Sequence, residues 1–245
     1  MTPLEIGLLI LGGVAAGVVN TLAGAGSLIT VPLLVLVGLP GTIANGTNRI
    51  GVLLHTLVAT WRFRAEGVPG IRRAIPMLVP VALGSLAGAY VISLVGDKTF
   101  ERLFGIVMIA LLLPMLRATT AASSALKPWS PLKTFLFFFA VGMYGGAFQA
   151  GVGIAILFGL SYAGHDLVQA NSIKVAISAA QALFAVPVFI IKDQVAWAPA
   201  AVLAVGFMLG GFLGVRIAVA GGERVIRPVL VVAVLALAGR MMGLY

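Results

Sequence analysis

Cysteine is absent from this 245-residue chain, and histidine occurs only twice. Without cysteine the chain forms neither disulfides nor thiolate sites, and it gives no indication of its redox compartment. Two histidines, with no carboxylate in the middle of a long apolar run, leave too few ligands for a metal ion. We therefore expect no metal and no cofactor, and transport of metal ions is disfavoured.

Charged side chains are also scarce. They make up 9% of the sequence, against about 25% in soluble globular domains, while 61% of the residues are hydrophobic. This composition predicts an integral membrane protein that is surrounded by a lipid bilayer, and the expected location is the prokaryotic cell (inner) membrane. The net charge is +9, but the basic residues stand singly or in loops, so no nucleic-acid partner is expected.

Long apolar runs predict an all-α polytopic membrane protein. A helix that spans a bilayer needs roughly 20 apolar residues. The runs that follow two glycine-rich breaks, at 28–39 and 154–162, are shorter than this, which suggests broken or re-entrant helices. Five runs lie in each half of the chain, at 4–22, 28–39, 50–61, 75–95 and 103–116, and at 132–150, 154–162, 175–191, 196–220 and 226–242.

The chain also contains an internal duplication. Residues 20–29 recur as residues 145–154, and residues 47–50 recur as residues 172–175, in both cases 125 positions later. Each copy has a glycine-rich break in an apolar run, then a hydroxyl residue, and two positions further on a cation. Two copies of a chain-breaking element that carries a cation are typical of transporters whose binding site lies between their halves.

A polar segment between the two copies divides the chain into two halves. We predict a first transmembrane repeat at 1–117, a linker at 118–131 that is rich in serine, threonine and proline, and a second transmembrane repeat at 132–245. A homodimer is a candidate assembly. Small-xxx-small patterns at 84–88 and 210–214 predict close helix packing at equivalent positions.

The charges of equivalent loops differ in sign. The loop at 61–73 has four arginines and one glutamate, whereas its counterpart around Lys192 and Asp193 is neutral; the next pair of loops shows the opposite bias. Cationic loops stay on the cytoplasmic side. The sequence therefore predicts that the two halves are inverted repeats, with about five helical segments each and a cytoplasmic linker at 118–131.

The candidate substrate site is the pair of glycine-rich breaks with the polar residues that follow them. A broken helix presents free N–H groups, which suit an oxyanion. Arg49 and Lys174 would add full charge, and an arginine at membrane depth costs roughly 2.5–3.5 kcal/mol unless it is offset. The alternative is that both cations lie at helix ends and reach the headgroups, and that the glycines serve packing alone. The candidate residues are Asn20, Gly24, Gly26, Ser27, Asn45, Thr47, Asn48, Arg49, Gln149, Gly151, Gly153, Asn171, Ser172 and Lys174.

Coupling and catalysis have few candidates in this sequence. His55 lies in an apolar run and titrates near neutral pH, so it is a candidate proton carrier, although a hydrogen bond to a neighbouring helix is the simpler role. Gln181 either faces the pathway or bridges helices. A hydrolase would need Ser27 with His55 as its nucleophile and base, but neither a G-x-S-x-G nor an H-E-x-x-H motif is present, so we expect no enzyme activity.

These motifs resemble those of a known family. The glycine-rich stretch at 24–27 with Pro32 downstream, the stretch at 44–47, and their counterparts in the second half are similar to the sulfite exporter TauE/SafE family over nearly the whole chain. The resemblance implies transport of small sulfur-containing or organic anions, such as sulfite, sulfonates or sulfoacetate. One departure is Leu157, which replaces a proline at the position equivalent to Pro32.

The sequence thus predicts a secondary transporter for a small anionic substrate that works by alternating access. An anion-selective channel would use the same hydrogen-bond donors and remains the alternative at this point.

Overall fold

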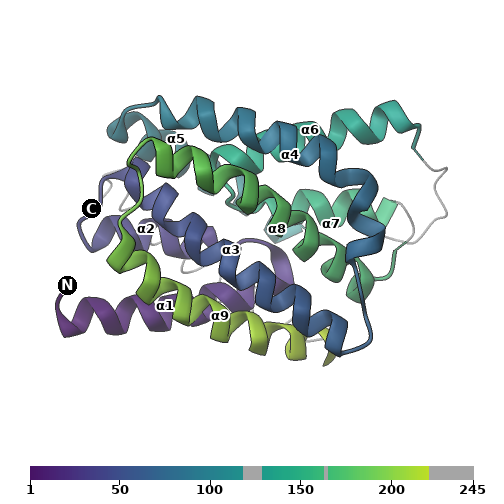
Figure 1. The fold of residues 1–245 in the computed structure, drawn as a ribbon, viewed down its shortest axis with the longest axis horizontal. Helices are drawn as coiled ribbons and strands as arrows, with labels where there is room; N and C mark the ends of the chain where they lie inside the picture. Colours follow the sequence, from purple (N-terminus) through teal and green to yellow (C-terminus); the bar gives the residue numbers. More distant parts are fainter. Residues whose placement is uncertain (118–128, 163–164, 221–245) are drawn as a thin grey trace.

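The structure is a computed structural model, and it describes residues 1–117, 129–162 and 165–220 of the chain. These residues form helices joined by short loops, without a strand among them (Figure 1). The all-α prediction is confirmed. The last predicted run, 226–242, and most of the predicted linker, 118–128, lie outside the described residues. The helices are α1 Pro3–Ala23, α2 Ser27–Leu36, α3 Gly41–Ala65, α4 Ile71–Ser93, α5 Asp97–Arg117, α6 Pro131–Ala147, α7 Val152–Tyr162, α8 Leu167–Ile191 and α9 Trp197–Ala220.

Local sequence explains where several helices begin. Thr2 caps α1 in a reciprocal capping box with Glu5, and Pro3 occupies the first helical position. Ser130 caps α6 ahead of Pro131, and the Asp166 side chain caps α8. Polar capping residues therefore mark helix starts even in a chain dominated by apolar residues.

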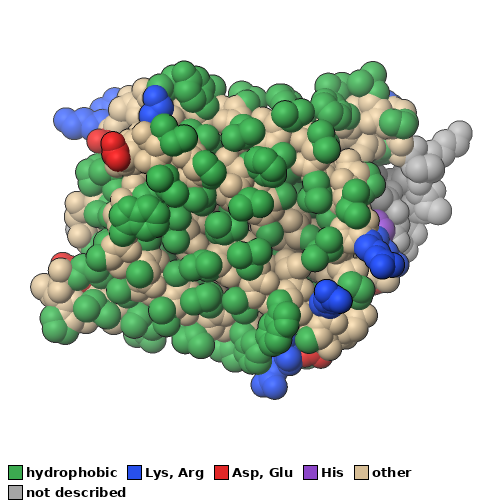
Figure 2. All heavy atoms as spheres, in the orientation of Figure 1, with side chains coloured by type: hydrophobic (Ala, Val, Ile, Leu, Met, Phe, Trp, Pro, Cys, Tyr) green, Lys and Arg blue, Asp and Glu red, His purple; other side chains and the backbone are tan. Residues whose placement is uncertain are grey.

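Four of the described helices are long and apolar enough to cross a membrane, namely α1, α4, α8 and α9. Large apolar side chains cover the face shown in Figure 2, and the charged groups on that face gather toward the two ends of the helices. Leu11, Leu83 and Leu209 are each about half exposed or more. In water such a continuous apolar surface would drive association, whereas a lipid bilayer accommodates it.

The helices α1 to α4 have counterparts in α6 to α9 that begin 125 to 128 positions later. Helix α2 begins at Ser27 and α7 begins 125 positions later at Val152, and α3 and α8 are both 25 residues long. Equivalent helices also make equivalent contacts. Helix α1 packs on α9 as α6 packs on α4, and α3 packs on α9 as α8 packs on α4. Helices α3 and α8 also contact each other, so they form the centre of the molecule.

Small residues allow the close contacts between the equivalent helix pairs. Any side chain at Gly17 of α1 would overlap the backbone of Gly210 in α9, and any side chain at Gly88 of α4 would overlap the backbone of Met143 in α6. Backbones that approach so closely gain extensive van der Waals contact in a membrane, where no hydrophobic effect holds helices together. The small-xxx-small prediction is confirmed at both interfaces.

Candidate functional site

The glycine-rich breaks of the two halves lie against each other. Gly24 ends α1 in the left-handed region with φ 68°, and its carbonyl accepts a hydrogen bond from the Gly153 N–H at 3.4 Å. A Cβ at either glycine would overlap the backbone of the other. The structure therefore brings together two predicted site residues that are 129 positions apart in the chain, at the point where α1–α2 and α6–α7 are broken.

The first break is held by side chains that the sequence analysis assigned to the substrate. The Gly26 N–H donates to Asn20 Oδ1 at 3.4 Å. Asn48 Nδ2 donates to Ser27 Oγ at 2.9 Å, and Thr30 Oγ1 donates to Asn48 Oδ1 at 2.6 Å. In this conformation these polar groups bind each other, so they position α2 against α1 and α3.

The space beside Gly26 is also occupied. A Cβ at this glycine would overlap the Ala16 carbonyl and Asn20. Gly26 therefore allows the turn between α1 and α2 to pack closely on α1. This is the packing role that was the alternative to substrate binding for the glycines.

The second break differs in its backbone. Gln149 and Gly151 both have positive φ, 59° and 66°, and Gln149 is the counterpart of Gly24. A non-glycine residue in this region costs roughly 1–2 kcal/mol. The Gln149 side chain is buried, and its Oε1 has no hydrogen-bond partner among the described residues. Strain of this kind together with an unpaired polar atom is found at functional sites more often than elsewhere.

Arg49 reaches across to the second half. It is fully buried, and its Nη1 and Nη2 donate to the Gly145 and Gly146 carbonyls at 2.6 Å and 2.7 Å. These carbonyls lie in the last turn of α6, where the helix dipole is negative. The guanidinium also lies 5.2 Å from the centre of the Phe189 ring on α8.

Lys174 makes the corresponding contacts in the first half. Its Nζ donates to the Asn20 and Thr21 carbonyls at 3.2 Å and 2.5 Å, near the end of α1, and to Asn171 Oδ1 at 2.7 Å. It is also buried. Both cations therefore lie inside the protein, and the alternative in which they reach the headgroups does not describe this structure.

Thr47 and Ser172 face away from the breaks. Thr47 Oγ1 accepts a hydrogen bond from the Ala196 N–H at 2.9 Å, and Ser172 Oγ donates to the Val68 carbonyl at 2.5 Å. Ala196 lies in the loop between α8 and α9, and Val68 lies in the equivalent loop between α3 and α4. The hydroxyls that the sequence analysis placed with the substrate thus fasten each central helix to a loop of the other half.

His55 packs between α3 and α9. Its Nδ1 lies 3.2 Å from the Phe207 carbonyl, and its ring lies against the ring of Phe207. Because a carbonyl only accepts, Nδ1 carries the proton. The hydrogen bond to a neighbouring helix that the sequence favoured is present, and Nε2 has no partner among the described residues.

Two side-chain amides near the end of α6 form a hydrogen bond through their nitrogen but not through their oxygen. Asn45 Nδ2 donates to the Ala147 carbonyl at 2.9 Å, and Gln181 Nε2 donates to the Val141 carbonyl at 3.0 Å, yet neither amide oxygen has a partner among the described residues. Gln181 also lies against Gly145. The sequence shows that Gln181 lies inside an apolar run, but its contact with α6 depends on how the helices pack.

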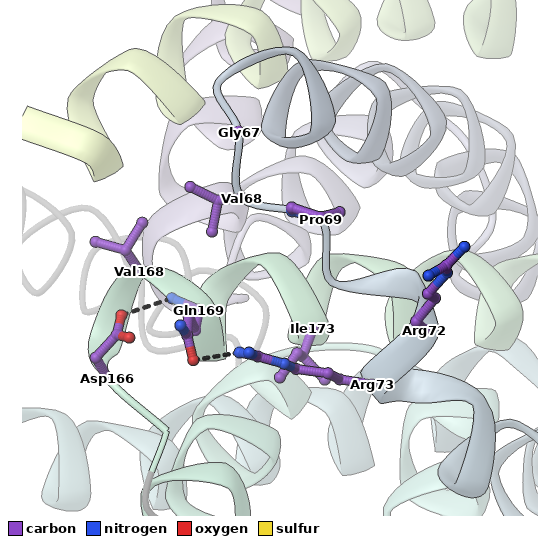
Figure 3. A pocket seen from close by; sticks show the side chains of 9 residues that line it. All are labelled: Gly67, Val68, Pro69, Arg72, Arg73, Asp166, Val168, Gln169 and Ile173. Carbon is purple, nitrogen blue, oxygen red and sulfur yellow. Dashed lines mark hydrogen bonds between the residues drawn. The ribbon is translucent and has the colours of Figure 1, made fainter.

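A surface pocket of about 420 Å³ opens at the end of the molecule where α3 passes into α4 (Figure 3). It lies between that loop and the first turns of α8, and Arg73 donates to Gln169 across it. Arg72 is exposed at its rim, and Ile173, adjacent to Lys174, lies at its inner wall. The residues that line it are Gly67, Val68, Pro69, Arg72, Arg73, Asp166, Val168, Gln169 and Ile173.

An apolar helical exterior, with four described helices that are long and apolar enough to cross a bilayer, defines an integral membrane protein. The family described as "Sulfite exporter TauE/SafE" matches residues 9–241. The chain belongs to this family of membrane transporters, and the resemblance noted in the sequence is confirmed.

Curated relatives agree in kind and in extent. The chain is 27% identical to "Probable membrane transporter protein ORF9" of Sinorhizobium sp over 240 residues, which cover 93% of this chain and 88% of the relative. It is 28% identical to a "Probable membrane transporter protein" of Haemophilus influenzae, with 90% and 88% covered. It is 26% identical to "Probable membrane transporter protein YfcA" of Escherichia coli K12, with 95% and 87% covered. No solved structure matches the chain significantly.

Proposed function

We propose that the protein is a secondary transporter that moves small oxyanions by alternating access, with its substrate site where the α1–α2 and α6–α7 breaks meet. The observation that carries this proposal is the pair of buried cations at these breaks. Arg49 and Lys174 place two positive charges in a core in which no carboxylate is buried among the described residues. A negatively charged ligand would offset them.

The halves are inverted repeats in this proposal. Figure 1 supports it, because the α3–α4 loop and the α8–α9 loop, which are equivalent, lie at opposite ends of the molecule. The exchange of helix contacts between the halves also fits a pseudo-two-fold axis in the membrane plane. Arginines crowd the α3–α4 end, so this end faces the cytoplasm.

The pocket beside Arg72 and Arg73 then opens toward the cytoplasm. Its inner wall contains Ile173, and the next residue along α8 is Lys174. Two arginines at its rim would raise the local concentration of anions. We assign it as the cytoplasmic entrance to the buried site.

Burial of the site favours a carrier over an open channel. The side chains at the breaks are almost wholly inaccessible, at 0% for Arg49, 1% for Lys174 and 2% for Gln149. An anion can reach them only after the helices move apart. The family name points to sulfite, and the chemistry of the site extends the proposal to sulfonates and other small organic anions.

The test uses the full chain in proteoliposomes. We expect saturable uptake of radiolabelled sulfite or sulfoacetate, and we expect that unlabelled anion inside the vesicles accelerates it by counterflow. Counterflow requires a carrier that reorients with bound substrate. Uptake that neither saturates nor shows counterflow would indicate a channel, and the absence of any anion flux would remove the proposal.

A further inference from the structure

Two buried amide oxygens near the end of α6 accept no hydrogen bond from the described residues. The orientation of the Asn45 amide is fixed, because Nδ2 donates to the Ala147 carbonyl and the oxygen must then point elsewhere. The same holds for Gln181, whose Nε2 donates to the Val141 carbonyl. These residues are 1% and 0% exposed, and both oxygens lack a partner among the described residues. An unpaired buried acceptor costs free energy.

An unpaired donor lies at the same turn of α6. Arg49 binds the Gly145 and Gly146 carbonyls through its two terminal nitrogens, while its Nε has no partner in the part of the chain that the structure describes. The Gln181 amide lies directly against Gly145. Residues 145–147 are therefore bordered by one open cationic donor and by the open oxygens of Asn45 and Gln181.

This combination of open groups selects among oxyanions. A fully deprotonated dianion such as sulfate offers only acceptors, so it would leave the amide oxygens unpaired and would bring its own oxygens against them. A metal cation would be repelled by Arg49. A singly protonated oxyanion satisfies both kinds of group, because its charged oxygen accepts from Arg49 and its hydroxyl donates to an amide oxygen.

We propose that the site binds oxyanions in their singly protonated form, with Arg49 Nε on the charged oxygen and the Asn45 and Gln181 oxygens as acceptors for the hydroxyl proton. This inference rests on the proposed transport function and specifies its substrate class. Each anion then carries one proton across the membrane. Coupling to the proton gradient needs no acidic relay, which agrees with the lack of buried carboxylates among the described residues.

Few protein groups near this site could produce a pH dependence of their own. The titratable side chains on α3, α6 and α8 that lie inside the helix bundle are Arg49, His55 and Lys174, which are buried, and Tyr144, which is partly buried. Of these, Arg49 contacts the end of α6, Lys174 contacts the end of α1, and His55 packs against α9. On α4 and at the start of α6, Arg72, Arg73 and Lys133 are exposed at the ends of their helices. A ligand that does not titrate separates any contribution of these groups from that of the substrate.

The experiment measures dissociation constants of the purified full chain for sulfite, sulfate and methanesulfonate between pH 6 and pH 9. Sulfite gains or loses a proton near neutral pH, whereas sulfate stays a dianion and methanesulfonate stays a monoanion without a hydroxyl. We expect the affinity for total sulfite to fall about tenfold per pH unit above its own proton transition. Methanesulfonate should bind more weakly, with little change with pH, and sulfate should bind most weakly.

Gln181→Met removes the open acceptor at nearly constant side-chain length. We expect it to reduce the preference for hydrogen sulfite over methanesulfonate by roughly tenfold, the value of about one hydrogen bond. Gln194→Met is the matched control, because Gln194 Nε2 also donates to a carbonyl, that of Ser93, and its Oε1 is also unpaired among the described residues, but it lies in the α8–α9 loop. This control should keep the wild-type preference.

The outcomes are distinguishable. Sulfate binding as tight as sulfite binding, or sulfite affinity that rises with pH, would overturn the inference while leaving anion transport intact. Equal preference in Gln181→Met and wild type would remove Gln181 as the determinant, and the same measurement on Asn45→Leu then decides whether either amide takes part. Absence of binding for all three anions would instead remove the proposed function itself.

Discussion

Arg49 and Lys174 occupy equivalent positions in the two halves, and each donates to the carbonyls that end the first helix of the opposite half. Arg49 binds Gly145 and Gly146, and Lys174 binds Asn20 and Thr21, which are the counterparts of those two residues. Each cation compensates the negative end of a broken helix. The two halves are therefore joined by a reciprocal pair of charged contacts at the candidate site.

This reciprocity predicts a double defect in Arg49→Met. Loss of a hydrogen bond to a charged group costs roughly 1.5–3 kcal/mol, so the free energy of unfolding should fall by at least that amount in a detergent-based denaturation assay. Affinity for an anion should fall as well. Arg64→Met is the control, because Arg64 is an exposed cation of the same helix, and its effect should stay within about 0.5 kcal/mol. Unchanged anion affinity in a folded Arg49→Met protein would restrict Arg49 to capping α6.

Gly24 and Gly153 yield a second prediction. Gly24→Ala adds a Cβ that overlaps Gly153 and also places alanine at φ 68°. We expect transport in proteoliposomes to fall at least tenfold, because the added Cβ forces the two breaks apart. Gly38→Ala carries the same kind of backbone strain at φ 94° but has open space around it. Equal losses in both variants would mean that backbone strain, roughly 1–2 kcal/mol, is the only effect and that the contact between the breaks has no role.

The sequence predicted the fold well because the signals involved are local. Apolar length, glycine breaks and capping residues are read within a few turns of chain, and the offset of 125 residues between the sequence copies equals the distance between the first residues of α2 and α7. The structure also brings Gly24 against Gly153 and buries both cations at the breaks. That these residues bind a substrate stays a prediction.

The roles of single side chains could not be read in the same way. Thr47 and Ser172 looked like substrate ligands because they precede the cations, yet they bind loops of the opposite half. Which way a hydroxyl points on a central helix depends on how α3 and α8 cross, and spacing alone does not encode that crossing. The open oxygen of Gln181 depends in the same way on the approach of α6 at Gly145.

The third prediction concerns orientation in the membrane. Because the chain contains no cysteine, single cysteines are specific labels. Arg64→Cys and Lys192→Cys place thiols at exposed positions of α3 and of the α8–α9 loop. With an impermeant maleimide on intact cells, we expect Lys192→Cys to react and Arg64→Cys to react only after permeabilisation. Labelling of both from the same side would contradict the inverted arrangement of the halves.

The last prediction separates strain from function at Gln149. Glycine adopts positive φ without penalty, so Gln149→Gly should raise the free energy of unfolding by about 1 kcal/mol. Asp193→Gly is the matched control, since Asp193 is the other non-glycine residue with positive φ in the described part of the chain, and it is exposed on a loop. Both variants should gain stability, but only Gln149→Gly should lose anion transport, by at least tenfold, because it also loses a buried amide at the break. If Gln149→Gly transports at the wild-type rate, the glutamine is not part of the site. If it unfolds more readily than wild type, the amide is a structural element of the second break, and its strained backbone has no functional explanation.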